Sequence, residues 1–178
     1  ECYAILSGKI RQEGKVAYLS FDDGWQSNLN LIPIIDKYQA PITIFVSIDP
    51  LLSGNFWWEY ALADGIELRN KMKLMSYKKF VSSLESLKKK YSLERSVLTE
   101  QELVKIASHP LVSIQSHTMS HPILTNCDDE ILSYELNSSK AYLENLLHHK
   151  IEAFSYPNGN FSNREIEAVK KAGYKMAF

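Results

Sequence analysis

The chain has 178 residues, of which 45% are hydrophobic and 23% are charged, and its formal net charge is −1. This composition fits one globular domain with a single sizeable core, and the lack of a basic patch argues against nucleic acid as a partner. No stretch approaches about 18 consecutive apolar residues, so no segment is predicted to span a membrane.

Five short apolar segments, bounded by polar, Gly or Pro residues, are predicted to be strands. Strands that are buried on both faces of a parallel sheet have this pattern. Helical patterns separate them, and strand alternating with helix predicts an α/β fold with a parallel sheet. The predicted strands are residues 16–21, 42–46, 112–115, 153–156 and 174–178, and the predicted helices are residues 29–38, 99–107, 131–147 and 162–172.

Local signals set the ends of these helices. Pro33 lies inside the first pattern and predicts a late start or a kink, because proline cannot donate a backbone hydrogen bond. Thr99 with Glu102, and Ser162 with Glu165, have the spacing of capping boxes. Gly173 is a suitable residue to end the last helix.

Residues 50–98 interrupt the alternation and are predicted to form a helical insertion. They begin with an aromatic stretch, and an apolar face at helical spacing follows, formed by Phe80, Leu84, Leu87 and Tyr91. Five strands cannot close an eight-stranded barrel. We therefore expect either an open sheet or a natural protein that continues beyond residue 178.

Two short runs far apart in the sequence carry candidate metal ligands. Asp23 follows the first predicted strand, and His117 and His121 follow the third. Two imidazoles and one carboxylate form a three-ligand set for a divalent ion, with a position left open for water. Pro122 favours a loop over a helix for the histidine pair. The alternative is that both histidines only form hydrogen bonds in a surface loop.

Asp22 and Asp23 are adjacent carboxylates at the end of a strand, where Gly24 permits a sharp turn. Two neighbouring carboxylates repel each other unless a cation or a shared proton compensates. We interpret Asp23 as the metal ligand and Asp22 as the group that accepts a proton from water. Considered alone, without the histidine pair, Asp-Asp-Gly is better explained as a turn or a helix cap.

A third run follows the fourth predicted strand. Backbone amides of the Pro157-Asn158-Gly159 turn could donate to a developing oxyanion, and Tyr156 could form a wall of the substrate pocket. The simpler interpretation is a plain turn. Trp25, which follows the Asp-Asp-Gly run, could stack on a sugar ring or fill the core.

Together the three runs resemble the polysaccharide deacetylase family, the NodB-homology carbohydrate esterases of carbohydrate esterase family 4. Residues 20–24 match the family's Thr/Ser-Phe-Asp-Asp-Gly motif, and residues 117–121 match its His-Thr/Ser-x-x-His motif. Residues 156–159 resemble the Tyr-Pro-x-Gly form of its third motif. The order of the motifs and their strand context agree over residues 15–178.

The resemblance implies a distorted (β/α) barrel of the polysaccharide deacetylase type, present here as an incomplete barrel with a helical insertion. It implies Asp22 as the general base and Asp23, His117 and His121 as metal ligands. The metal would be zinc, with cobalt or nickel as alternatives. The implied reaction removes acetyl groups from N-acetylated amino sugars in chitin oligomers, peptidoglycan or poly-N-acetylglucosamine, and some members act on O-acetyl xylan.

The sequence departs from the family pattern in its third motif and at its end. Ser155 lies where the longer form of the third motif has an arginine that orients the base. The fourth motif, with its Trp, and the Leu-x-His that carries the general acid have no counterpart, and both would lie beyond Phe178. We therefore expect the 178-residue chain alone to be nearly inactive.

We predict that residues 1–178 form a single catalytic domain acting on a carbohydrate polymer or oligomer. The alternatives are a catalytically impaired glycan-binding module of the same fold, an O-acetyl esterase, or a metal hydrolase that acts on other amides or phosphates. An uncovered sheet edge at residues 174–178 could allow self-association. The resemblance favours the cell envelope or secretion, and the sequence itself leaves the localisation open.

Overall fold

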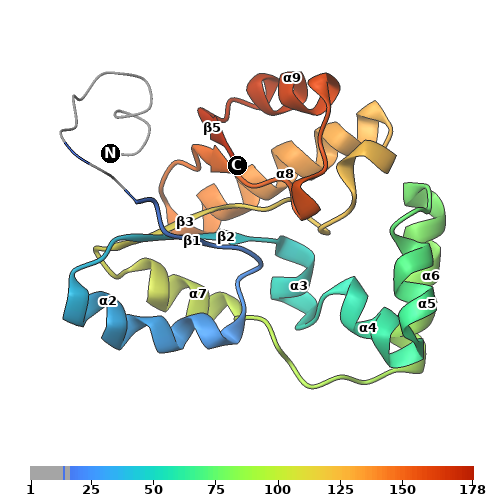
Figure 1. Ribbon diagram of the computed structural model, residues 1–178, viewed down its shortest axis with the longest axis horizontal. Helices are drawn as coiled ribbons and strands as arrows, with labels where there is room; N and C mark the ends of the chain where they lie inside the picture. The colour runs from blue at the N-terminus through green and yellow to red at the C-terminus, as the bar shows by residue number, and fades with distance from the viewer. Residues whose placement is uncertain (1–13, 15–16) are drawn as a thin grey trace.

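The structure, a computed structural model, describes Gly14 and residues 17–178. Its centre is a sheet of five parallel strands that lie side by side in chain order, as the alternating pattern predicts (Figure 1). The strands are β1 (Ser20–Phe21), β2 (Ile42–Val46), β3 (Val112–Ser116), β4 (Ala153–Phe154) and β5 (Met176–Ala177).

The sheet curls like part of a barrel. Tyr18 precedes β1 and Phe178 follows β5, yet their rings stack with centroids 4.9 Å apart. The Phe178 ring also lies 5.6 Å from the ring of Phe45, which is fully buried on β2. The two outer strands therefore approach each other across the inside of the curve, and the predicted incomplete barrel is confirmed.

Helices connect the strands and cover the outside of the curled sheet. In the view of Figure 1, α2 and α7 lie below the strands, α8 and α9 lie above them, and α4 to α6 stand to the right. The helices before the insertion are η1 (Gln26–Leu31) and α2 (Ile32–Tyr38), and the later ones are α7 (Glu100–Ala107), η2 (Leu124–Asn126), α8 (Asp129–Leu147), η3 (Pro157–Gly159) and α9 (Asn163–Lys171).

The predicted helix signals are confirmed. A 3₁₀ segment precedes α2, and Pro33 lies in the first turn of α2, where no intrahelical donor is needed. Thr99 accepts a hydrogen bond from the Glu102 amide at 3.2 Å, and the Glu102 carboxylate accepts one from the Thr99 amide at 2.8 Å. The Ser162 box closes in the same way at the start of α9. Gly173 follows α9 with φ of 79°, a conformation that favours glycine.

Three predicted strands are too long, and residues 15 and 16 lie outside the described residues. Strand 16–21 is reduced to Ser20–Phe21, 153–156 to Ala153–Phe154, and 174–178 to Met176–Ala177. Beyond β4 the chain still donates from the Ser155 amide to the Ser116 carbonyl, at 3.1 Å. The regular ladder nevertheless stops, because the chain turns there into the loops of the candidate site.

The predicted helical insertion separates β2 from β3. Its helices are α3 (Ile48–Ser53), α4 (Trp57–Asp64), α5 (Ile66–Met72) and α6 (Tyr77–Lys90). The predicted apolar face of α6 is confirmed, because Phe80 and Leu87 are buried in a second hydrophobic cluster, against which Leu84 and Tyr91 pack. Trp57 and Met72 belong to this cluster, so it joins α4, α5 and α6 into one packed unit beside the barrel.

β5 forms one end of the sheet. It pairs with β4, and no second strand partner for it is found among the described residues. Within the same residues, no helix is both long enough and apolar enough to cross a bilayer.

Candidate metal centre

The three sequence motifs meet at one rim because the strands that precede them are parallel and in register. Val46 of β2 lies opposite Ser116 of β3, and Ser116 lies opposite Phe154 of β4. The loops that begin at Asp22, His117 and Ser155 therefore leave the sheet at the same edge. In parallel sheets this carboxyl edge is where ligands bind.

Each of the three loops contains non-glycine residues with positive φ, a conformation that is costly for a side chain with a Cβ. Asp23 has φ of 80°, Thr118 74°, His121 55° and Asn158 56°. Gly24 has φ of 78°, and a Cβ there would lie 3.2 Å from Val46. The sharp turns that aim these side chains at one point are therefore part of the site.

Asp23, His117 and His121 form the group that the sequence predicts. Asp23 Oδ1 lies 3.4 Å from His121 Nε2 and 3.6 Å from His117 Nε2. One ligand atom from each residue lies within 4.8 Å of the other two. Both histidines are buried, at 1% and 5% exposure, and Asp23 is partly buried. This set of imidazole and carboxylate donors suits a divalent ion such as zinc.

The hydrogen bond of His117 fixes which of its nitrogens can bind a metal. His117 Nδ1 lies 2.8 Å from the carbonyl oxygen of Ser155. A carbonyl can only accept, so Nδ1 carries the hydrogen and the lone pair is on Nε2, the atom that faces Asp23. His117 is therefore oriented as metal-binding histidines usually are.

The titration behaviour of the three residues fits the same role. Burial lowers the pKa of His117, and burial together with the charge of His117 holds the pKa of His121 well below its ordinary value. Burial and the neighbouring charge of Asp22 raise the pKa of Asp23 to about 7. A buried carboxylate with a raised pKa lacks a compensating cation, and a divalent ion would supply one.

Glu135, on α8, binds the backbone of the loop that carries His117 and His121, here called the histidine loop. The sequence pattern did not indicate this role. Its side chain is fully buried and accepts from the backbone amides of Met119, at 2.8 Å, and Ser120, at 2.9 Å. The Ser120 hydroxyl and the Tyr77 hydroxyl of the insertion donate to its other oxygen, at 2.6 and 3.2 Å. Burial raises the pKa of Glu135 despite these donors.

Asp22 lies in the same cavity but outside the cluster of ligand atoms. It is exposed, and its Oδ2 accepts a hydrogen bond from the Ser155 hydroxyl at 3.2 Å. Ser155 therefore contacts both predicted parts of the site, through its hydroxyl to Asp22 and through its carbonyl to His117.

The third run is divided between the core and the cavity. Tyr156 is buried, and its ring packs against Phe154 and Phe161. Pro157 is buried, and Gly159 is exposed with φ of 66°. Asn158 is the member of this run that lines the cavity.

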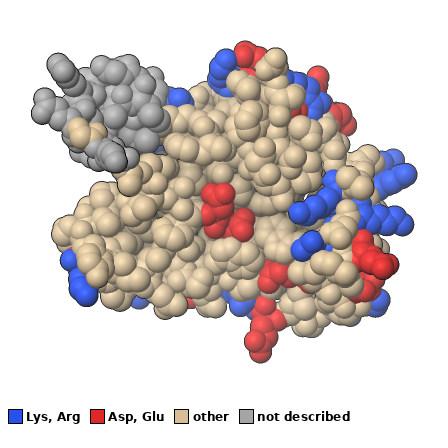
Figure 2. Space-filling model, in the orientation of Figure 1, with Lys and Arg blue, Asp and Glu red and all other residues tan. Residues whose placement is uncertain are grey.

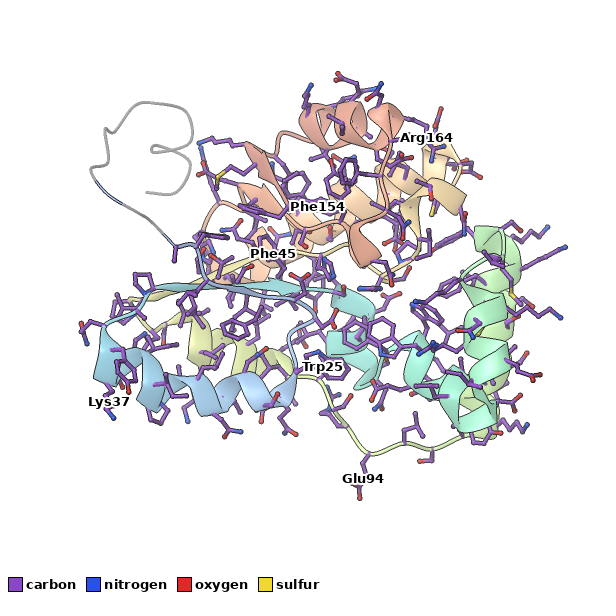
Figure 3. The ribbon with its side chains drawn as sticks, viewed as in Figure 1. Trp25, Lys37, Phe45, Glu94, Phe154 and Arg164 are labelled. Atoms are coloured by element: carbon purple, nitrogen blue, oxygen red, sulfur yellow. The ribbon has the colours of Figure 1, made fainter. Side chains whose placement is uncertain are left out.

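Aromatic side chains lie beside the cluster of Asp23, His117 and His121, here called the metal cluster, on the side of the insertion. Figure 3 places Trp25 below the strands, near the first helices of the insertion. Trp25 Nε1 donates to Asp23 Oδ2 at 3.1 Å, and the Trp25 ring packs against Phe56 and Trp58. Trp57 Nε1 donates to the His121 carbonyl at 3.0 Å, and the Trp58 ring lies 4.6 Å from the His121 ring. Trp25 thus orients Asp23 through a hydrogen bond. Trp25 is not among the described residues that line the cavity.

The cavity over the metal cluster has a volume of about 310 Å³. Four of its lining residues belong to the insertion, and the sequence reasoning did not assign any of them to the site. The lining residues are Asp22, Asp23, His117, His121 and Asn158 from the barrel loops, and Trp57, Trp58, Arg69 and Lys73 from the insertion. Figure 2 shows Lys and Arg side chains gathered over the insertion helices and an acidic group near the middle of the same face.

Comparison with known proteins agrees with this geometry. The sequence profile of the polysaccharide deacetylase family, described as "Polysaccharide deacetylase", matches residues 9–177. The chain is 33% identical over 177 residues to YxkH of Bacillus subtilis (strain 168), whose name places it among the polysaccharide deacetylases. The match covers 99% of this chain and 48% of YxkH, so the chain spans about half the length of that relative.

Solved structures share the fold. The Streptococcus pyogenes deacetylase PplD, in complex with acetate, superposes with a TM-score of 0.70 at 22% identity, over 98% of this chain and 60% of PplD. The polysaccharide deacetylase BC0361 of Bacillus cereus superposes with a TM-score of 0.64 at 20% identity, over 96% of this chain and 42% of BC0361. The matched profile, the relative and the motif geometry agree: the chain belongs to the polysaccharide deacetylase family.

Proposed function

We propose that this chain is the metal-binding part of a carbohydrate deacetylase that removes acetyl groups from N-acetylated amino sugars in a polysaccharide. The observation that carries the proposal is the cluster of Asp23, His117 and His121 with a second carboxylate, Asp22, in the same cavity. Three ligands and a separate base can generate the attacking water, and hydrolysis of an amide requires in addition a general acid that gives the leaving amine a proton.

We assign the metal site to zinc, with cobalt or nickel as substitutes, because two imidazoles and one carboxylate suit these ions. An ion in this site would supply Lewis-acid chemistry, acidifying water and polarising the acetyl carbonyl. His117 and His121 offer neutral nitrogens at neutral pH, because burial lowers the pKa of both side chains.

Asp22 is the proposed base. Its carboxylate accepts the proton of the attacking water, and the Ser155 hydroxyl holds it in position at 3.2 Å. The Gly159 amide donates to the Tyr156 carbonyl at 2.9 Å and the Asn160 amide to the Pro157 carbonyl at 3.3 Å, so both amides are engaged within the turn. The proposed oxyanion donor is therefore the backbone N–H of Asn158, a residue that lines the cavity.

Trp58 fits a carbohydrate substrate. Its ring lines the cavity beside His121 and is partly exposed, and a flat aromatic face suits the apolar face of a sugar ring. Trp57 lines the same cavity but is buried in the hydrophobic cluster of the insertion. Membership of the polysaccharide deacetylase family supports a polymeric substrate.

Acetate release tests the proposal. The protein is incubated with N-acetylglucosamine oligomers and with O-acetyl xylan, after chelation and again after reloading with zinc. We expect zinc-dependent acetate release from the amino-sugar oligomers. Release from xylan alone would identify an O-acetyl esterase. Glycan binding without acetate release at any metal loading would identify a binding module.

A further inference from the structure

Two basic side chains from the insertion enter the cavity that holds the metal cluster. Arg69 lies in the last turn of α5, and Lys73 follows four residues later, directly after the helix. Residues four apart lie on the same face of a helix, so both side chains extend from one face of α5. Both are half-buried and line the same cavity as Asp22 and Asp23.

Neither cation has an acidic partner within 4 Å among Gly14 and residues 17–178. Lys73 donates to the Asn158 side-chain oxygen at 3.4 Å, a long contact to a neutral group. Arg69 donates to the side-chain oxygen of the adjacent Asn70 at 2.9 and 3.3 Å. Both contacts are exposed, so an incoming ligand can replace them at little cost.

The charges in the cavity do not balance when a divalent ion is bound. The two negative charges of Asp22 and Asp23 offset the two positive charges of the ion, and the histidines are neutral. The positive charges of Arg69 and Lys73 therefore remain as a formal excess of two in the cavity. A partly enclosed cavity with excess positive charge attracts an anion.

We propose that Arg69 and Lys73 form an anion subsite that selects amino-sugar substrates carrying a carboxylate or phosphate substituent near the acetamide group. This inference rests on the proposed function, because it assumes that the sugar binds over the metal cluster. Arg69 offers the planar fork that pairs with a carboxylate or phosphate, and Lys73 adds a point charge. Trp58, whose ring lies 4.6 Å from the His121 ring in the same cavity, would stack on the sugar ring.

A binding experiment tests the subsite without requiring turnover. The zinc-loaded chain is titrated calorimetrically with matched tetrasaccharides of N-acetylated amino sugars: one carries a single O-carboxymethyl group, one its methyl ester, and one a phosphate monoester. We expect the free acid to bind about fivefold more tightly than the ester at low salt, since each half-exposed ion pair is worth up to about a factor of five. The preference should shrink as salt is added. The phosphate arm shows which anion the subsite prefers.

The double variant R69Q/K73Q should reduce the acid-to-ester affinity ratio to about one. Lys71→Gln is the control, because it removes one positive charge from an exposed position on the same helix and should leave the ratio unchanged. Circular dichroism and a zinc titration on each variant establish that folding and metal binding are intact. The single variant Lys73→Arg, which keeps the charge, should retain most of the preference.

Equal affinity for acid and ester in the unmodified chain would overturn the subsite, as would a failure of all tetrasaccharides to bind the zinc-loaded chain. A uniform change in all affinities and in zinc affinity in R69Q/K73Q would also overturn it, because the cations would then only balance Asp22 and Asp23. Failure of the chain to bind zinc would instead reject the proposed function, so the two failures are distinguishable.

Discussion

Ser155 donates its hydroxyl hydrogen to Asp22 across 133 residues of sequence, with the two oxygen atoms 3.2 Å apart. The arginine that orients the base in the longer form of the third motif is absent here, and this contact offers a replacement. A serine hydroxyl is a weaker and shorter donor than a guanidinium, but it leaves Asp22 open to the cavity. Ser155 is therefore a positioning residue for the proposed base.

Ser155→Ala should lower kcat for acetate release by about five- to tenfold, the rate equivalent of one ordinary hydrogen bond. Zinc affinity should not change, because the substitution preserves the Ser155 backbone carbonyl that holds His117. Ser155→Thr keeps a hydroxyl and should restore most of the rate. A loss of zinc together with activity in Ser155→Ala would show that the residue acts through the metal cluster instead.

Asp22→Asn should bind zinc normally and lose activity by about 10²- to 10⁴-fold, because an amide cannot accept the proton of the attacking water. Asp23→Asn is the paired variant and should weaken zinc binding itself, because it replaces an assigned ligand. Metal content by elemental analysis and acetate release should be measured on the same preparations. Loss of metal from Asp22→Asn would mean that the two aspartates exchange the roles assigned to them.

His117→Ala should abolish high-affinity zinc, cobalt and nickel binding, because it removes a ligand atom from a cluster that has three. His109→Ala is the control, since His109 pairs with Asp36 away from the cavity. Isothermal titration at neutral pH measures both variants. Unchanged affinity in His117→Ala would place the metal elsewhere.

Zinc affinity should fall as the pH decreases below about 7. The metal-free fold raises the pKa of Asp23 from 3.8 to about 7, so it favours the protonated acid, and binding must displace that proton. Affinity should therefore drop by up to about tenfold per pH unit from pH 7 to pH 5 and level off above pH 7. The lowered pKa values of His117 and His121 keep both largely neutral near pH 7. Calorimetry in two buffers of different ionisation enthalpy counts the released proton. A zinc affinity that stays constant from pH 7 to pH 5 would mean that zinc binding displaces no proton from Asp23.

Glu135→Ala should lower the free energy of unfolding by about 3 kcal/mol, since it leaves two buried amides, at Met119 and Ser120, without an acceptor. For a chain of this size the melting temperature should fall by roughly 6–12 °C. Glu130→Ala, at an exposed position on α8, should cost less than about 1 kcal/mol. Equal effects of the two substitutions would mean that the histidine loop does not depend on Glu135.

The sequence alone determined the parallel α/β plan and the residues of the metal cluster. Both follow from local chemistry: short apolar runs form buried strands, and Asp23, His117 and His121 each follow such a run. Parallel strands bring all their carboxyl ends to one rim, so placement after a strand predicts proximity in space. The capping boxes at Thr99 and Ser162 are equally local, because donor and acceptor lie within four residues.

The tertiary structure alone decided the rest of the site. In the sequence, Glu135 is not distinguishable from an ordinary exposed polar residue of a helix. Only the packing of α8 against the histidine loop reveals that its carboxylate binds two backbone amides. Trp58 and Arg69 lie on helices of the insertion, and Lys73 directly follows one of them. Their sequence pattern predicts burial or exposure, but it does not indicate the direction in which α4 and α5 face. That direction depends on the burial of Trp57 and Met72 against α6, a contact between segments distant in sequence. Periodicity reports which face of a helix is buried, but only long-range packing determines what the other face meets.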